Sequence, residues 1–146
     1  MSGAGPERGA MAEIDVGDEL ATERFTLSGE RVRAYAQIAN MPGPRFFSDE
    51  EAQKEGLPGQ IVPGNLSLAF FSGLLARSVP NGRVVRLHAT FRSIVRPGVP
   101  LVLRGVVTEK HCADDGDRLE CDLVLESAEG DRLVTGTATV ALLRRA

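Results

Sequence analysis

The feature that most constrains the fold is an almost entirely apolar segment near the middle of the chain. Residues 66–75 are apolar except for two serines and a glycine, and the segment is about half as long as a bilayer-spanning helix needs to be. Asn65 is a suitable cap for a helix that starts here, and we expect this helix to run to about Ser78. A helix that is apolar on all sides requires burial. The rest of the chain must therefore supply an apolar surface around it.

The region after this helix has the pattern of β-strands. From Arg83 onward apolar and polar residues alternate, which indicates strands with one covered face that includes Val85. Glycine-containing turns at residues 96–98, 114–117 and 129–130 divide the region into four runs. We expect these four strands to form an antiparallel meander. A sheet with one apolar face and an all-apolar helix bury each other when the sheet curls around the helix, so the predicted class is α+β.

A short strand and two short helices are predicted before the central helix. The strand covers residues 25–27, and Ser28 is placed to cap the helix that follows it. Ser48 and Glu51 form a capping box for the second helix, with Ser48 accepting from the backbone and Glu51 reaching back. Gly56 is expected to end that helix.

Length, composition and charge fit one domain. The chain has 146 residues, of which 42% are hydrophobic and 25% charged, the balance of a single globular domain. Residues 1–12 have no apolar run and are expected to be a disordered tail before a single domain at 13–146. The net charge of -3, with Arg interleaved among Asp and Glu, leaves no basic stripe for nucleic acid. We expect a cytoplasmic protein that binds neither nucleic acid nor a membrane.

The two cysteines match no zinc-binding pattern. Cys112 and Cys121 lie on either side of the turn at 114–117, so they either face each other across a hairpin or fill space as small apolar side chains. The second interpretation is the one expected in a reducing compartment. We predict no metal and no cofactor.

Two stretches of the chain resemble the MaoC-like hydratases and dehydratases, which belong to the hot-dog fold superfamily. Residues 39–46 (ANMPGPRF) match the family motif SGDxNPIH, and residues 61–66 (IVPGNL) match IAHGM. The resemblance covers most of the chain, from about Ile14 to Leu143. It implies a hot-dog fold, with a curled antiparallel sheet wrapped around a buried central helix, and an acyl thioester of coenzyme A or of a carrier protein as the ligand.

The chain departs from the family at the residues that transfer protons. The resemblance implies that an aspartate and a histidine activate a water and deliver a proton to the α carbon of the thioester. Met41 stands at the aspartate position and Phe46 at the histidine position, and neither side chain can transfer a proton. Hydration through that pair is therefore not expected here, and the catalytic residues are unknown.

The positions that bind substrate in the family are partly retained. The resemblance implies that Gly64, at the positive end of the central helix, presents its amide to the thioester carbonyl, with Asn65 beside it. Pro63 replaces a second family histidine and restricts the backbone there. Arg45 is either a solvated loop arginine or a group that holds a carboxylate or a phosphate.

Three functions remain open at this level. The first is a MaoC-like protein that binds an acyl thioester beneath the central helix and is related to R-specific enoyl-thioester hydratases and dehydratases. The second is a non-catalytic acyl-binding subunit that pairs with an intact homologue, and the third is another reaction in the same cavity, such as thioester hydrolysis or cyclisation. His88 and His111 are expected at the surface. Because open sheet edges pair between subunits, we expect a homodimer or a heteromer with a related subunit.

Overall fold

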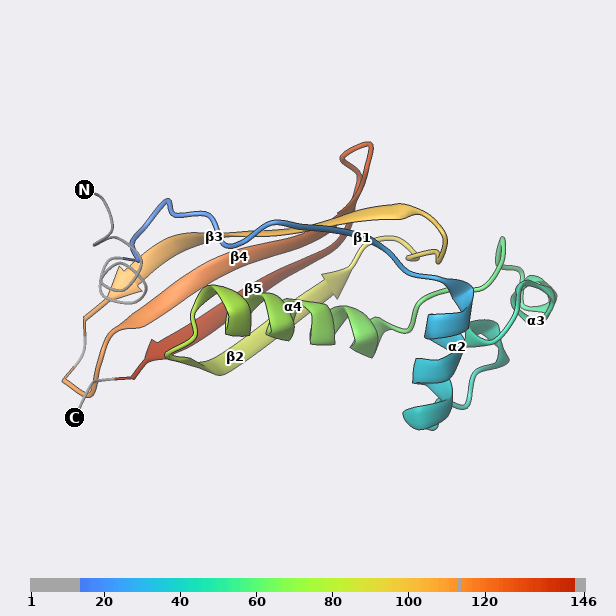
Figure 1. Cartoon of the computed structure of the whole chain (residues 1–146), viewed down its shortest axis with the longest axis horizontal. Coiled ribbons are helices and arrows are strands. Elements are labelled where there is room, and N and C mark those ends of the chain that lie inside the picture. Colours follow the sequence, from blue (N-terminus) through green and yellow to red (C-terminus); the bar gives the residue numbers. More distant parts are fainter. Residues whose placement is uncertain (1–13, 113, 144–146) are drawn as a thin grey trace, which may run out of the picture.

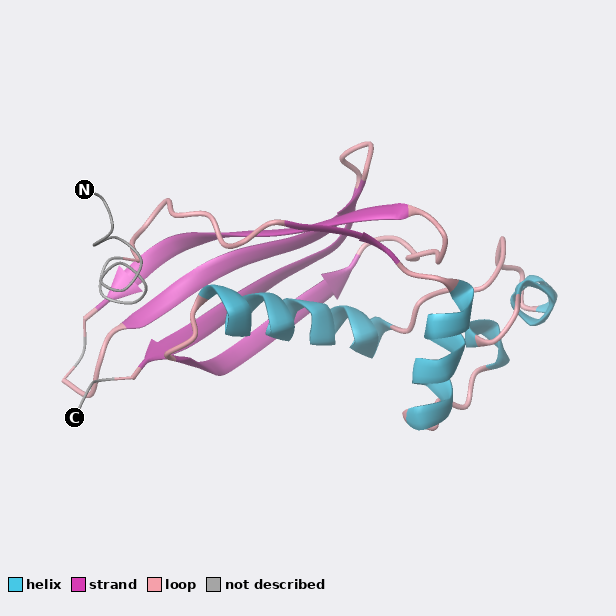
Figure 2. Cartoon of the chain, in the orientation of Figure 1, coloured by secondary structure: helices cyan, strands magenta, loops and turns pink. Residues whose placement is uncertain are grey.

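The computed structural model describes residues 14–112 and 114–143 (Figure 1), so the predicted tail lies outside the described residues. One short strand precedes the helices, and the four long strands follow them along the chain (Figure 2). In chain order they are β1 (Glu23–Thr26), α2 (Gly29–Ile38), the 3-10 helix η1 (Pro44–Phe46), α3 (Asp49–Lys54), α4 (Gly64–Ser78), β2 (Gly82–Phe91), β3 (Pro100–His111), β4 (Arg118–Ser127) and β5 (Arg132–Leu142). None of the described helices combines the length and the apolar character needed to cross a membrane.

The strands form one antiparallel sheet in the order β1-β3-β4-β5-β2. The four predicted long strands are confirmed, but the prediction that all four form a meander is wrong. Only β3, β4 and β5 are neighbours in sequence order, whereas β2 pairs with β5. The reason is the connection at residues 92–99, which is longer than a hairpin turn. It is held at the far end of the sheet, where the Gly98 amide donates to the Leu27 carbonyl at 2.6 Å.

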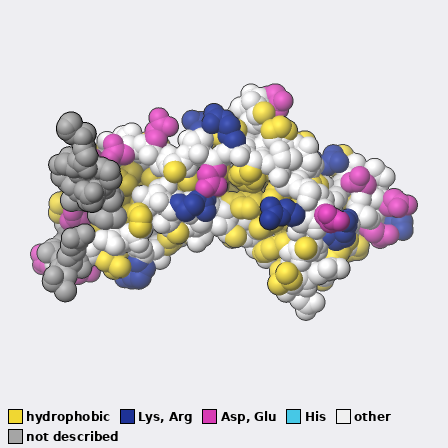
Figure 3. All heavy atoms as spheres, in the orientation of Figure 1, with side chains coloured by type: hydrophobic (Ala, Val, Ile, Leu, Met, Phe, Trp, Pro, Cys, Tyr) yellow, Lys and Arg dark blue, Asp and Glu magenta, His cyan; other side chains and the backbone are white. Residues whose placement is uncertain are grey.

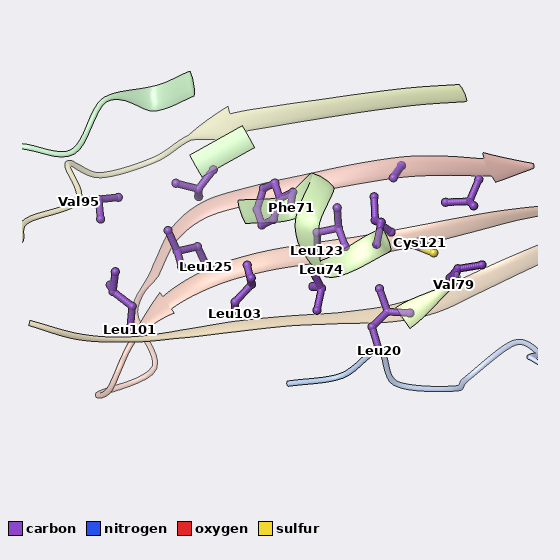
Figure 4. Close-up of a cluster of buried hydrophobic side chains, with 14 of the residues drawn as sticks. Leu20, Phe71, Leu74, Val79, Val95, Leu101, Leu103, Cys121, Leu123 and Leu125 are labelled. Carbon is purple, nitrogen blue, oxygen red and sulfur yellow. The ribbon is translucent and has the colours of Figure 1, made fainter. Parts of the chain in front are cut away.

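Helix α4 lies across the concave face of the curled sheet (Figure 1). Its side chains Phe71, Leu74 and Leu75 are fully buried, and Figure 4 shows Phe71 and Leu74 among sheet residues such as Leu123. Burying a phenylalanine or leucine side chain contributes roughly 1.5–3 kcal/mol. The predicted packing of an apolar helix inside a curled sheet is therefore confirmed.

Two details of the predicted central helix are wrong. The helix begins at Gly64, with Pro63 as the N-cap residue, so Asn65 lies in the first turn and does not cap it. The helix is also buried on one side only, since Ala69 and Ser72 on the opposite side are exposed. A single sheet covers one face of a helix, and among the described residues no other element covers the second face of α4.

The segment that contains α2, η1 and α3 lies beyond the end of the sheet, next to the N-terminus of α4 (Figure 1). Ser28 and Ser48 cap α2 and α3 as predicted, each accepting from a backbone amide at 3.1 Å. Gly56, with a φ of +87°, follows the end of α3. Glu51 does not complete a capping box, because its carboxylate instead accepts from Lys54 at 3.0 Å.

Strand β2 is an edge strand with an irregular register. The pairing with β5 shifts by one residue between Val84 and Arg86. Val84 lies opposite Val140 and Arg86 opposite Thr139, so Val85 has no partner residue on β5. The prediction that Val85 points to the covered face is therefore wrong, and its side chain is 48% exposed. Among the described strands β2 pairs with β5 alone, which leaves its other edge open.

The two cysteines do not face each other. Cys121 lies opposite Val107 and is buried, whereas Cys112 follows the end of β3 and is exposed, and both are free thiols. Burial, followed by the charges of Glu120 and Asp122, raises the pKa of the Cys121 thiol from 9.0 to about 11. Cys121 is therefore a protonated core residue at neutral pH, and the space-filling interpretation is confirmed for it.

Candidate functional site

The way α2 ends places Met41 beside the start of α4. Asn40 adopts a φ of +55°, the Asn40 amide donates to the Gln37 carbonyl at 3.2 Å, and the Met41 amide donates to the Ala36 carbonyl at 2.9 Å. This is a Schellman motif, which reverses the chain direction after a helix. The Asn65 side-chain nitrogen then donates to the Met41 sulfur at 3.6 Å. The two stretches that carry the family resemblance therefore meet in space.

Phe46 and Arg45 belong to the packing of the helical segment. The Phe46 ring is buried against Gly43, where an added Cβ would lie 2.9 Å from the ring. The Arg45 guanidinium carbon lies 5.2 Å from the centre of that ring, and its Nε donates to Glu55 at 2.9 Å. An anionic ligand at Arg45 would have to displace the Glu55 carboxylate.

Gln60 joins the helical segment to the loop before α4, and sequence analysis missed it. Its side chain is 5% exposed and donates to the carbonyls of Gly29 at 3.0 Å and Phe46 at 2.8 Å. Its backbone amide donates to Asp49 at 2.8 Å, and its carbonyl accepts from Arg96 at 3.2 Å. These bonds fix the position from which the chain enters α4. An isolated polar residue in a loop carries no periodic signal that would reveal this role.

The N-terminus of α4 carries no side-chain cap. Pro63 offers no side-chain hydrogen bond, and the first turn contains no acidic residue. The backbone amides of this turn and the positive end of the helix dipole are thus not neutralised by a carboxylate of the helix itself. The preceding loop is held in place by the Val62 amide, which donates to the Val95 carbonyl at 2.8 Å.

A cavity of about 330 Å³ opens at this end of the helix, a volume at the lower end of the range of small-molecule sites. The Phe91 ring covers Gly64, since a Cβ added to Gly64 would lie 3.0 Å from Cζ of that ring. On the face that carries α4, hydrophobic side chains remain visible between the sheet and the helical segment (Figure 3). The lining includes Val62, Gly64, Ser67, Phe91, Ile94 and Val95.

Ser67 is a lining residue that sequence analysis did not single out. Its side chain is 1% exposed, and its hydroxyl has no hydrogen-bond partner among the described residues. Leaving a buried hydroxyl unpaired costs about 1–3 kcal/mol. In the sequence this serine is only an interruption of an apolar run, and nothing in that pattern reveals whether its hydroxyl is paired.

Both histidines lie away from this cavity. His88 points to the opposite face of the sheet beside Thr137, where it lines a larger hollow of about 540 Å³. His111 is exposed, with its Nε2 3.0 Å from Glu109. In the described part of the chain, no three His, Cys, Asp or Glu side chains gather in a way that could hold a metal ion. The larger hollow has no helix terminus, so the cavity at α4 is the better candidate for a ligand with a carbonyl group.

Comparisons with known proteins agree on a family. Residues 13–129 match the family described as "MaoC like domain". The mitochondrial 3-hydroxyacyl-[acyl-carrier-protein] dehydratase of Arabidopsis thaliana is 32% identical over 85 residues, which are 58% of this chain and 51% of that protein. The chain thus spans about half the length of this curated relative.

Solved structures show the same fold at low sequence identity. The (R)-hydratase from A. caviae involved in PHA biosynthesis has a TM-score of 0.79 at 23% identity, over 90% of this chain and 98% of that one. A chain of the ChsH1-ChsH2 complex from Mycobacterium tuberculosis has a TM-score of 0.77 at 14% identity, over 87% of this chain and 97% of that one. The curled antiparallel sheet around α4 is therefore the hot-dog fold that the sequence predicts.

Proposed function

Because the chain belongs to the family of MaoC-like domains, we propose that it binds an acyl thioester of coenzyme A or of an acyl carrier protein at the start of α4. The observation that carries this proposal is the uncapped N-terminus of α4, which opens on a cavity with mostly apolar walls. A thioester presents one carbonyl oxygen next to an apolar acyl chain. Backbone amides at a helix N-terminus bind such an oxygen, and apolar walls accept the chain.

Gly64 is the residue whose amide we place against the carbonyl oxygen. A Cβ added to Gly64 would lie only 3.0 Å from the Phe91 ring. Any side chain at this position would therefore crowd the ring, and only glycine leaves the space between the ring and the helix open. Pro63, with a φ of -62°, holds the backbone in its extended form before the first turn. The Asn65 side chain is turned toward Met41, so Asn65 contributes to this site through its backbone amide.

Hydration by an aspartate–histidine pair is not part of the proposed function. Met41 and Phe46 stand where the family motif has the two proton-transfer residues, and His88 and His111 lie elsewhere. A water molecule needs a base within reach to attack an enoyl thioester. We expect the absorbance of conjugated enoyl-CoA thioesters to stay constant when the purified protein is added.

The test is calorimetric titration of the full chain with acyl-CoA thioesters of several lengths. We expect binding that Gly64→Ala weakens roughly tenfold or more, because the added methyl group crowds Phe91 and the carbonyl position. Gly73→Ala is the matched control, since Gly73 lies in the same helix and an added Cβ meets only the flexible Arg77 side chain. If no thioester binds, or if both variants bind equally well, the proposal is wrong. Loss of enoyl absorbance would instead favour a hydratase, and release of free thiol a thioesterase.

A second candidate function is that of an acyl-binding subunit within an assembly. Strand β2 has an open edge, and the hydrophobic side chains of Val84, Val85, Phe91 and Ile94 along or just after it are exposed. Open edges with apolar side chains favour pairing with another chain. We propose that β2 pairs with a second copy of this chain or with a related subunit that carries the proton-transfer residues. One solved structure of this fold is a complex of two differently named chains, ChsH1 and ChsH2.

Native mass spectrometry tests this assembly. We expect at least a dimer, which Val85→Lys dissociates because it places a charge on the open edge. Val16→Lys is the control, since Val16 is exposed to a similar extent but precedes β1. A monomer in the unmodified protein, both alone and with an Asp/His-bearing homologue, would contradict the second candidate function.

A cytoplasmic location is part of the proposal. Cys112 is an exposed free thiol that forms no disulfide with Cys121. Free exposed thiols persist mainly in reducing compartments. Fractionation of the source cells with an antibody against the chain would test the location. Recovery with an extracytoplasmic fraction would contradict it.

A further inference from the structure

A hollow of about 540 Å³ lies on the face of the sheet opposite to α4, and the proposed function does not use it. Its volume is within the range of small-molecule sites. Two neighbouring rows of side chains cross it from strand to strand. The first row contains Thr135 and Arg104, and the second contains His88, Thr137 and Asp122. The rows lie two residues apart along each strand, which is roughly 7 Å.

The end of the hollow at the first row is basic. Arg104 is held by Glu126, whose two carboxylate oxygens accept from its Nε at 2.9 Å and from a terminal nitrogen at 3.3 Å. The Arg92 Nε donates to the Thr135 hydroxyl at 3.3 Å, so its two terminal nitrogens remain as donors. Arg132 lies opposite Glu126, and it forms no ion pair with any described residue. Three guanidinium groups of the lining therefore lie beside one carboxylate, which is an excess of two positive charges.

The second row carries groups that bind hydroxyls. The side chains of His88, Thr137 and Asp122 lie next to one another across β2, β5 and β4, and all three residues are exposed. Glu19 bridges to Val106 of β3 and adds a second carboxylate at this end. A carboxylate accepts hydrogen bonds, whereas a threonine hydroxyl and a neutral imidazole both donate and accept. The row is therefore suited to a ligand group with several hydroxyls.

We propose that this hollow is a second ligand site, separate from the cavity at α4, and that it binds a phosphorylated sugar. A phosphate monoester such as phosphoserine carries about −1.5 to −2 charges at pH 7, which matches the excess charge of the basic end. Guanidinium groups bind phosphate oxygens through paired hydrogen bonds. The sugar hydroxyls then lie at Asp122, Thr137 and His88, roughly 7 Å along the strands from the phosphate. A pentose 5-phosphate has about this separation between its phosphorus and its vicinal hydroxyls.

An amino acid fits this arrangement less well. Its carboxylate balances one of the two excess positive charges, and its ammonium group donates but does not accept. A sugar hydroxyl does both, so it pairs with the carboxylate of Asp122 and also with the donors of Thr137 and His88. The arrangement therefore favours a phosphorylated sugar over a zwitterion.

The experiment is calorimetric titration of the full chain with ribose 5-phosphate, ribose and inorganic phosphate. We expect ribose 5-phosphate to bind roughly tenfold more tightly than either of the other two, because it engages both ends of the hollow. Arg132→Ala should weaken the binding of ribose 5-phosphate roughly tenfold. The matched control is Arg86→Ala, which removes an arginine of β2 two residues before His88, outside the lining. Arg132 is chosen because Arg92 also borders the cavity at α4.

Asp122→Asn separates a sugar site from a merely basic surface. Because the substitution removes a negative charge, a basic surface would bind both ribose 5-phosphate and inorganic phosphate more tightly. In the proposed site Asp122 accepts from sugar hydroxyls, so Asp122→Asn should weaken ribose 5-phosphate roughly tenfold without weakening inorganic phosphate. Asp122 and Arg132 are exposed, so both variants should melt at the temperature of the unmodified chain.

A competition with butyryl-CoA shows whether the two sites are separate. We expect ribose 5-phosphate to bind equally well when the thioester is saturating. Displacement of ribose 5-phosphate would show that the hollow receives the nucleotide of coenzyme A, and the inference would be wrong. It is also wrong if ribose 5-phosphate does not bind at millimolar concentration, if Arg86→Ala weakens it as much as Arg132→Ala, or if Asp122→Asn strengthens it.

Discussion

Gln60→Ala tests whether one buried side chain holds the helical segment against α4. The substitution removes the amide that donates to Gly29 at 3.0 Å and to Phe46 at 2.8 Å. A hydrogen bond of this kind contributes about 0.5–1.5 kcal/mol, and a carbonyl left unpaired in a buried position costs about 1–3 kcal/mol. We therefore expect the free energy of unfolding to fall by about 2–4 kcal/mol. For a chain of this length the melting temperature should fall by roughly 4–16 °C.

Urea unfolding followed by circular dichroism measures the loss, and amide hydrogen exchange locates it. Gln53→Ala is the control, because Gln53 is exposed and its side chain makes one hydrogen bond, to the Pro58 carbonyl. Removing that side chain should cost no more than about 0.5 kcal/mol. In Gln60→Ala the faster exchange should concentrate at residues 44–62. The explanation is wrong if the two variants lose equal stability, or if the loss of protection is spread evenly over the sheet.

Other substitutions test the packing of α4 and the state of the buried thiol. Gly136→Ala should destabilise the chain by about 1–3 kcal/mol, because the new Cβ would lie 2.9 Å from both the His88 carbonyl and the Phe71 ring. Gly73→Ala in α4, where the new Cβ meets only the flexible Arg77 side chain, should be neutral or stabilise the chain by up to about 1 kcal/mol in the same urea assay. Equal effects of the two substitutions would contradict the packing described. The pKa of Cys121 is raised from 9.0 to about 11, so the folded chain keeps a proton that the unfolded chain releases. Its contribution to stability should be fully present below pH 9 and lost between pH 9 and 11, by about 2–3 kcal/mol. Cys121→Ala should lack this part of the pH dependence in urea titrations, and an unchanged dependence would refute the shift.

Much of the fold follows from local patterns. Ser28 and Ser48 could be assigned as helix caps because a cap depends on residues within one turn of it. The strands could be assigned because alternation is a local signal. The neighbour of β2 could not, since it depends on the path of residues 92–99 across the sheet. Val85 was assigned to the wrong face because a bulge changes the alternation without any change in composition.

The candidate site could be predicted only in part. The family motif led to Gly64 and to Met41, and the structure places Met41 against Asn65 of the first turn of α4. Ser67 and Gln60 could not be found in the same way, because their importance depends on which partners surround them in space. The sequence does not tell a paired hydroxyl from an unpaired one.

The central claim is that a thioester carbonyl lies at the N-terminus of α4, and an NMR titration tests it most directly. Butyryl-CoA and 3-hydroxybutyryl-CoA would be added to the ¹⁵N-labelled chain while the backbone amide signals are followed. We expect the largest shifts at Gly64 and Asn65, with smaller shifts at Ser67 and at residues 91–95 of the cavity wall. Shifts confined to His88 and Thr137 on the opposite face of the sheet, or no shifts at saturating ligand, would contradict the account.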